Sequence, residues 1–69
     1  MTIGEKAKEL IEEKGVSIVK IAEILNINRI TLYNKFNGKS MFTADELLKV
    51  SRFINTPISN FYDGDSDEK

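Results

Sequence analysis

Residues 17–39, SIVKIAEILNINRITLYNKFNGK, constrain the fold of this chain more than any other stretch. Two short apolar patterns of helical period follow one another here with only a few residues between them. The first predicts a helix over 18–25, whose apolar stripe consists of Ile18, Ile21, Ala22 and Leu25. The second predicts a helix over 28–37 that turns Leu32 and Phe36 inward. Two helices this close together must reverse the chain sharply between them.

The residues around these two helices suit such a reversal. Ser17 and Asn28 are good N-caps, because their side-chain oxygens accept free backbone N–H groups. Asn26 lies at the turn, and Asn adopts the left-handed backbone conformation more readily than most residues. Gly38 follows Asn37 at the usual glycine position after a helix. The stretch is therefore predicted to be a helix-turn-helix, in which the second helix projects outward.

The flanking sequence completes an all-α domain. A helix over 3–14 begins with the capping-box pair Thr2 and Glu5, and a helix over 44–55 begins with the equivalent pair Thr43 and Glu46. Thr56 and Pro57 then begin a short fifth helix that extends to residue 62. We expect one compact five-helix domain over residues 1–62. Residues 63–69 are predicted to be an acidic, disordered tail, because they are mostly Gly, Ser and charged residues.

Composition excludes several classes of function. The sequence has no Cys and no His, so it has no thiolate or imidazole for a metal site or for the usual nucleophilic systems. We therefore predict no enzyme activity, no cofactor, no metal and no small-molecule substrate. The sequence contains no apolar run of about 18 residues, the length that would predict a membrane span. Together with the absence of Cys, this favours a cytoplasmic protein.

The central stretch resembles the helix-turn-helix family of phage repressors and Cro proteins, the lambda repressor-like domains. Ala22 stands where that family keeps a small residue between the two helices. The family's apolar positions and its usual ending after the second helix are matched by Ile21, Leu25, Ile27, Leu32 and the run from Phe36 to Lys39. The sequence differs from the family at two positions. Ile18 stands where the family usually has a polar residue that contacts a phosphate, and Asn26 replaces the common turn Gly. The resemblance extends over roughly residues 2–62 and implies a phage- or prophage-type transcriptional regulator that binds double-stranded DNA sequence-specifically.

Helical geometry predicts which side chains would read base edges. Ile30, Tyr33 and Asn34 lie on one face of the helix over 28–37, with Arg29 at its N-terminal edge. A helix of this kind fits the major groove. Arg29 is suited to guanine and Asn34 to adenine, because each can form two hydrogen bonds with that base. Ile30 and the Tyr33 ring are suited to thymine methyl groups.

The resemblance also implies contacts with the DNA backbone on both sides of this helix. The predicted phosphate contacts are Ser17, Asn28, Asn37, Lys39 and Ser40. Asn37 and Gly38 also have a structural interpretation as a helix terminator, and the two roles are compatible. A purely solvated role is the favoured interpretation for Lys20, Lys35 and Lys49.

Charge supports two alternatives. The net charge of −1 favours a protein-interaction module of the same fold, such as an antitoxin, an anti-repressor or an adaptor. The distribution of charge along the chain favours a DNA partner instead, because residues 14–52 contain seven basic and only three acidic side chains. Screening limits each charge to a range of about 8 Å at physiological salt, so the local excess outweighs the net value.

We expect a homodimer on a palindromic operator, since one small module buries too little surface against DNA for useful affinity. Four apolar residues near the C-terminal end are candidates for the dimer surface. The same four residues could instead close the core of the monomer, and the sequence does not separate these alternatives. They are Phe53, Ile58, Phe61 and Tyr62.

Overall fold

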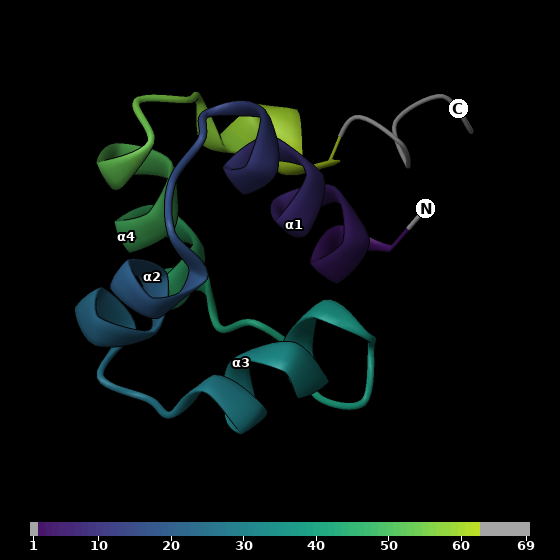
Figure 1. Cartoon of the computed structure of the whole chain (residues 1–69). Coiled ribbons are helices and arrows are strands. Elements are labelled where there is room, and N and C mark those ends of the chain that lie inside the picture. The colour runs from purple at the N-terminus through teal and green to yellow at the C-terminus, as the bar shows by residue number, and fades with distance from the viewer. Residues whose placement is uncertain (1, 63–69) are drawn as a thin grey trace.

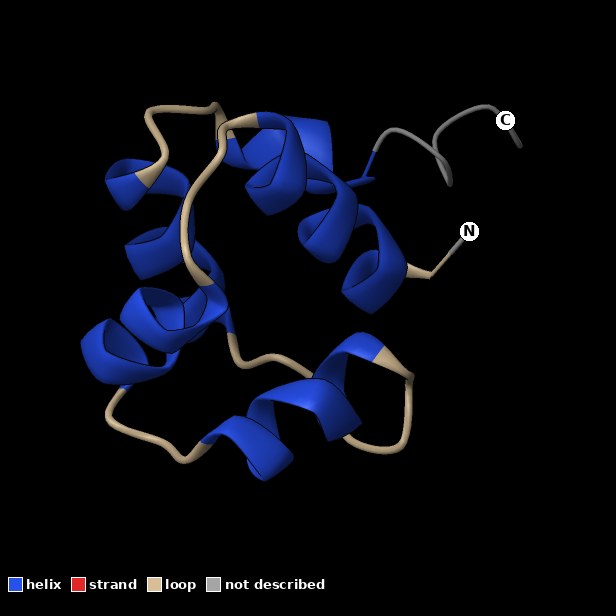
Figure 2. Ribbon diagram, viewed as in Figure 1, coloured by secondary structure: helices blue, strands red, loops and turns tan. Residues whose placement is uncertain are grey.

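The computed structural model describes residues 2–62, which form helices joined by short loops and contain no strand (Figures 1 and 2). The predicted all-α class is confirmed. The four α-helices and one 3-10 helix are α1 (Ile3–Glu13), α2 (Ile18–Leu25), α3 (Arg29–Phe36), α4 (Ala44–Phe53) and η1 (Ile58–Tyr62). The predicted tail, residues 63–69, lies outside the described residues.

The fifth predicted helix is a 3-10 helix rather than an α-helix. Its five residues follow Pro57, whose carbonyl oxygen accepts a hydrogen bond from the Asn60 backbone N–H at 3.0 Å. This bond spans three residues and so has the 3-10 pattern, which is common in segments too short for a stable α-helix. The prediction of the fold therefore holds, with one α-helix fewer than expected.

The helix starts follow the predicted capping chemistry. In α1 the Thr2 hydroxyl accepts from the Glu5 N–H at 3.1 Å, and the Glu5 carboxylate accepts from the Thr2 N–H at 3.1 Å. Thr43 and Glu46 form the same reciprocal pair at the start of α4. Each capping box satisfies backbone donors that would otherwise lack a partner, which is why both helices begin where the sequence predicts.

Left-handed residues end the two central helices. Asn26 has φ 59° and ψ 44°, which reverses the chain after α2. Gly38 has φ 84° after α3, where the Lys39 N–H donates to the Asn34 carbonyl at 2.9 Å. Gly38 N–H donates to the Lys35 carbonyl at 3.3 Å, which completes a Schellman motif. These two turns determine where α3 begins and ends.

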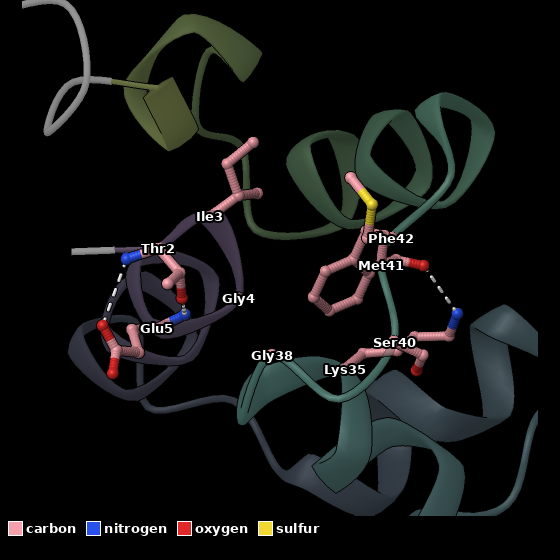
Figure 3. Close-up of a pocket in the computed structure, with 9 residues that line it drawn as sticks. All are labelled: Thr2, Ile3, Gly4, Glu5, Lys35, Gly38, Ser40, Met41 and Phe42. Carbon is pink, nitrogen blue, oxygen red and sulfur yellow. Dashed lines mark hydrogen bonds between the residues drawn. The ribbon is translucent and has the colours of Figure 1, made fainter.

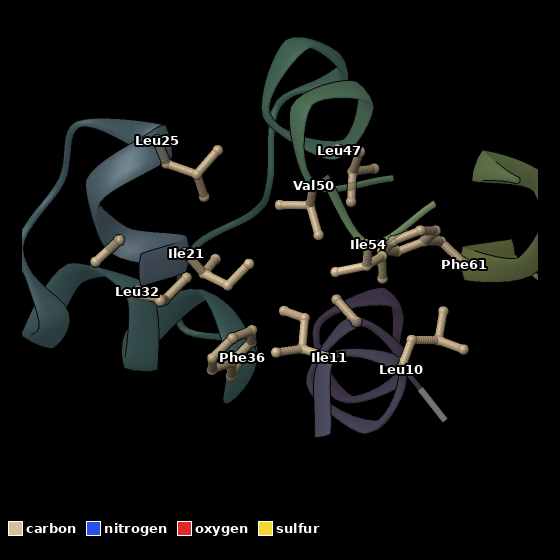
Figure 4. Close-up of a cluster of buried hydrophobic side chains, with 12 residues drawn as sticks. Leu10, Ile11, Ile21, Leu25, Leu32, Phe36, Leu47, Val50, Ile54 and Phe61 are labelled. Atoms are coloured by element: carbon tan, nitrogen blue, oxygen red, sulfur yellow. The ribbon is translucent and has the colours of Figure 1, made fainter. Parts of the chain in front are cut away.

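The core lies between the helices, with side chains from every element (Figure 4). Phe36 of α3 and Phe61 of η1 are its largest buried side chains, each only 1% exposed. Phe61 therefore closes the core of the monomer, and the alternative of a dimer contact is wrong for this residue. Ile58 also packs against the core, whereas Phe53 and Tyr62 remain 43% and 40% exposed.

Helix α3 packs mainly against α1 and α2. In Figure 1 it lies along the lower edge, with the α2–α3 turn on one side and the loop toward α4 on the other. Gly4 in the first turn of α1 is buried against α3. A Cβ added to Gly4 would lie 2.9 Å from the Phe36 carbonyl oxygen and closer still to that of Lys35. The two backbones approach so closely that only glycine fits there.

Candidate nucleic-acid interface

The outer face of α3 carries the four residues predicted to contact bases. Ile30 is 73% exposed and Tyr33 is 43% exposed, both high values for large apolar side chains. Arg29 is exposed at the first position of the helix, and Asn34 is half-buried. Leu32 and Phe36 point into the core from the opposite side of α3 (Figure 4). Packing of these two residues thus orients the outer face.

Tyr33 is held at the edge of this face by an aromatic contact. Its ring meets the buried Phe36 ring edge-on, with centroids 6.2 Å apart and planes inclined at 68°. Such edge-to-face pairs are favourable beyond the area that they bury. One side of the Tyr33 ring is therefore anchored, while its exposed part remains available for a ligand.

The N-terminal flank contains the caps of α2 and α3. The Ser17 hydroxyl accepts from the Val19 N–H at 3.1 Å, and the Asn28 side-chain oxygen accepts from the Thr31 N–H at 2.8 Å. Capping uses only acceptor capacity, so the Ser17 hydroxyl proton and the Asn28 amide group can still donate to a phosphate. The capping and phosphate-binding roles of both residues are therefore chemically compatible.

The C-terminal flank contains Asn37, Lys39 and Ser40, all of which are exposed. Their backbone N–H groups are used within the turn: Asn37 N–H donates to Tyr33, while those of Lys39 and Ser40 both donate to Asn34. A phosphate on this flank would therefore bind their side chains rather than their backbone amides. Asn37 and Gly38 do terminate the helix through their backbone N–H groups, and this role leaves the Asn37 side chain free to contact a phosphate.

Basic side chains differ in how they are paired. Lys20 with Glu23 and Lys49 with Asp45 form exposed pairs at 3.5 and 3.7 Å, as expected for solvated charges. Such pairs contribute little stability. Within residues 2–62, no acidic side chain forms an ion pair with Arg29 or Lys39. These two cations are thus available at the two ends of α3.

Lys35 differs from the prediction that it would be solvated. Its side chain is only 11% exposed and its amine lies 3.2 Å from the Glu46 carboxylate. The prediction failed because Lys35 and Glu46 are far apart in sequence, and their meeting depends on how α3 packs beside the start of α4. The close approach of α1 and α3 at Gly4 was also not predicted, although an isolated glycine inside a helical pattern can have a packing reason.

None of the helices that the structure describes has the length and apolar character needed to cross a membrane. In residues 2–62, no group of three or more His, Cys, Asp or Glu side chains could hold a metal ion.

Helix α2, the left-handed turn at Asn26 and the outward-facing α3 define a helix-turn-helix domain. The profile of a helix-turn-helix family matches residues 8–61, most of the chain. The chain belongs to this family, which is lambda repressor- and Cro-like. No curated protein and no solved structure is significantly similar to it. Members of this family bind DNA, are commonly transcriptional regulators and are generally not enzymes.

Proposed function

We propose that this protein is a sequence-specific regulator of transcription, of the phage or prophage type, that reads double-stranded DNA with α3 in the major groove. The main support is the arrangement of α3: a face with Arg29, Ile30 and Tyr33 exposed lies between two flanks of donors suited to phosphate. A helix in the major groove needs this combination, because phosphate contacts set its orientation and base contacts supply specificity. Such a protein would act in the cytoplasm, where phage DNA is transcribed.

Each proposed base contact matches the chemistry of its side chain. Arg29, without an acidic partner in the described region, can donate two hydrogen bonds to guanine O6 and N7. Asn34 can donate to and accept from adenine on the same groove edge. Ile30 and the Tyr33 ring offer apolar surface to thymine methyl groups. Ser17, Asn28, Asn37, Lys39 and Ser40 are the proposed phosphate contacts.

We further propose that two copies bind a palindromic operator. A single module of this size buries only about 600–1,000 Å² against DNA, so a homodimer would raise the affinity to a useful level. Its two recognition helices would lie about 34–36 Å apart, one turn of the double helix. Of the four apolar residues considered for the dimer surface, Phe53 and Tyr62 remain exposed enough to contribute.

A protein-interaction module is the second candidate function. The net charge of −1, the apolar Ile18 at a position where the family uses a polar residue, and the 73% exposed Ile30 favour it. Salt separates the two functions. Binding to DNA weakens steeply as salt rises, because each neutralised phosphate releases counterions, whereas an apolar protein interface responds little.

The experiment that tests the proposal is selection of bound duplexes from a random DNA pool, with wild type, Arg29→Ala and Arg52→Ala. Arg52 is an exposed arginine on α4, so its replacement removes the same charge away from α3. We expect wild type and Arg52→Ala to enrich the same palindrome. Arg29→Ala should lose preference at one base pair in each half-site, worth about 1–3 kcal/mol.

If wild type enriches no sequence at low salt, sequence-specific DNA binding is refuted and a protein partner becomes the preferred candidate. If Arg52→Ala loses the same base preference as Arg29→Ala, the effect is one of charge, and the assignment of Arg29 to a base is wrong.

A further inference from the structure

The C-terminal half of α3 is connected to the following loop by one half-buried lysine. The amine of Lys35 donates to the Met41 carbonyl oxygen at 3.0 Å, a contact drawn in Figure 3. The same amine lies 3.2 Å from the carboxylate of Glu46 in the first turn of α4. The two side chains are 11% and 19% exposed, whereas both partners of the Lys20–Glu23 pair are more than half exposed. Lys35 thus links three consecutive segments of the chain.

The Glu46 carboxylate is itself fixed in position. Its Oε1 atom, which faces Lys35, also accepts the Thr43 N–H at 2.9 Å as part of the capping box of α4. The Phe42 ring lies beside this pair, 5.9 Å from the Lys35 amine and 5.9 Å from the Phe36 ring. The end of the loop is therefore bound both to α4 and to the buried side of α3.

This loop carries the proposed phosphate contacts of the C-terminal flank. Gly38 and the hydrogen bonds to Asn34 hold its beginning against α3. Residues 41 and 42 form no regular structure, and the end of the loop is held to α3 by the Phe42–Phe36 ring contact and by the polar contacts of Lys35. A shift of the loop would move Lys39 and Ser40 relative to Arg29 and Asn34.

We propose that Lys35 is a positioning residue for DNA recognition, and that its ion pair with Glu46 keeps the phosphate-binding loop in register with the base-reading face of α3. The inference rests on the proposed function, because it assigns a role within that interface. Lys35 does not itself bind phosphate, since two of its three donors are directed to Met41 and Glu46 and its side chain is largely covered. Lys35 affects DNA binding by fixing the positions of Lys39 and Ser40.

Charge effects and positioning effects predict opposite results for Glu46→Gln. Removal of a negative charge near DNA should by itself strengthen binding to every sequence. Gln can still complete a capping box, so the substitution keeps the start of α4 and weakens only the pairing with Lys35. If positioning dominates, Glu46→Gln weakens binding to the selected operator despite the favourable change in charge.

The test measures affinity for the selected operator and for a scrambled duplex over a range of salt, with wild type, Lys35→Met, Glu46→Gln and the double variant. Asp45→Asn is the matched control, because Asp45 precedes Glu46 in the same turn and its pair with Lys49 is exposed. Thermal unfolding is measured for each. Partial unfolding alone lowers both affinities by the same factor, so it leaves their ratio unchanged.

We expect Lys35→Met to lower the ratio of operator to scrambled affinity roughly five- to thirtyfold, with an unchanged salt slope. Glu46→Gln should lower the ratio in the same direction. The double variant should lose no more than the larger single loss, because both substitutions break one pair. Asp45→Asn should leave the ratio as in wild type.

Two results would overturn the inference while leaving the proposed function intact. One is an unchanged ratio in both single variants when wild type prefers its operator. The other is a salt slope reduced by about 1 in Lys35→Met with strengthened binding in Glu46→Gln, which would make Lys35 a phosphate contact. A wild type without sequence preference would instead refute the proposed function, and this inference with it.

Discussion

Replacement of Gly4 by alanine tests the close approach of α1 and α3 directly. In most helices this change stabilises the fold by about 0.5–1 kcal/mol, because glycine loses more backbone freedom on folding. Here the new methyl group would meet the carbonyl oxygens of Lys35 and Phe36 and would lie 3.1 Å from the Phe36 carbonyl carbon. Backbone atoms cannot move aside by changing rotamer, so one helix must shift.

The expected size of the effect follows from these two opposing contributions. Overpacking costs about 1–3 kcal/mol, and the smaller gain in helix propensity offsets only part of it. A net loss of roughly 1–2 kcal/mol in the free energy of unfolding should remain. For a domain of this length, each 1 kcal/mol corresponds to about 4–8 °C in Tm, so the melting temperature should fall by roughly 4–16 °C.

Thermal unfolding followed by circular dichroism measures this shift. Lys8→Ala is the control, because Lys8 is exposed on the same helix. Its replacement should change the stability by no more than about 0.5 kcal/mol. If Gly4→Ala melts at or above the wild-type temperature, the close contact between α1 and α3 is wrong.

Two further predictions concern the core and the end of α3. Phe61→Ala should cost about 3–5 kcal/mol in urea unfolding, whereas Phe53→Ala should cost roughly 1 kcal/mol or less; similar losses would contradict the assignment of Phe61 to the core. Gly38→Ala should cost about 1–2 kcal/mol through its φ of 84° alone, since nothing lies within 4 Å of the added Cβ. Gly38→Asn should cost less, because Asn tolerates this conformation; an equal or larger loss would show that backbone strain is not the cause.

The face of α3 that is proposed to read DNA is largely predictable from the sequence because the signals that define it are local. Asn28 caps α3 and the Leu32–Phe36 spacing determines which side turns inward, so the exposure of Arg29 and Ile30 follows from helical period. The same holds for the turn, where Asn26 has the expected left-handed conformation. Base and phosphate contacts remain predictions, since they depend on a DNA partner.

By itself, the sequence determined the all-α class, the positions of the helix starts and the helix-turn-helix, because capping and apolar period act within one or two turns of a helix. Only the tertiary structure shows that Phe61 lies in the core, that α3 packs directly against the backbone at Gly4, and that Lys35 forms an ion pair with Glu46. Each of these contacts joins residues on different helices. The packing angle and distance between two helices depend on all the side chains between them, and no local pattern encodes that geometry.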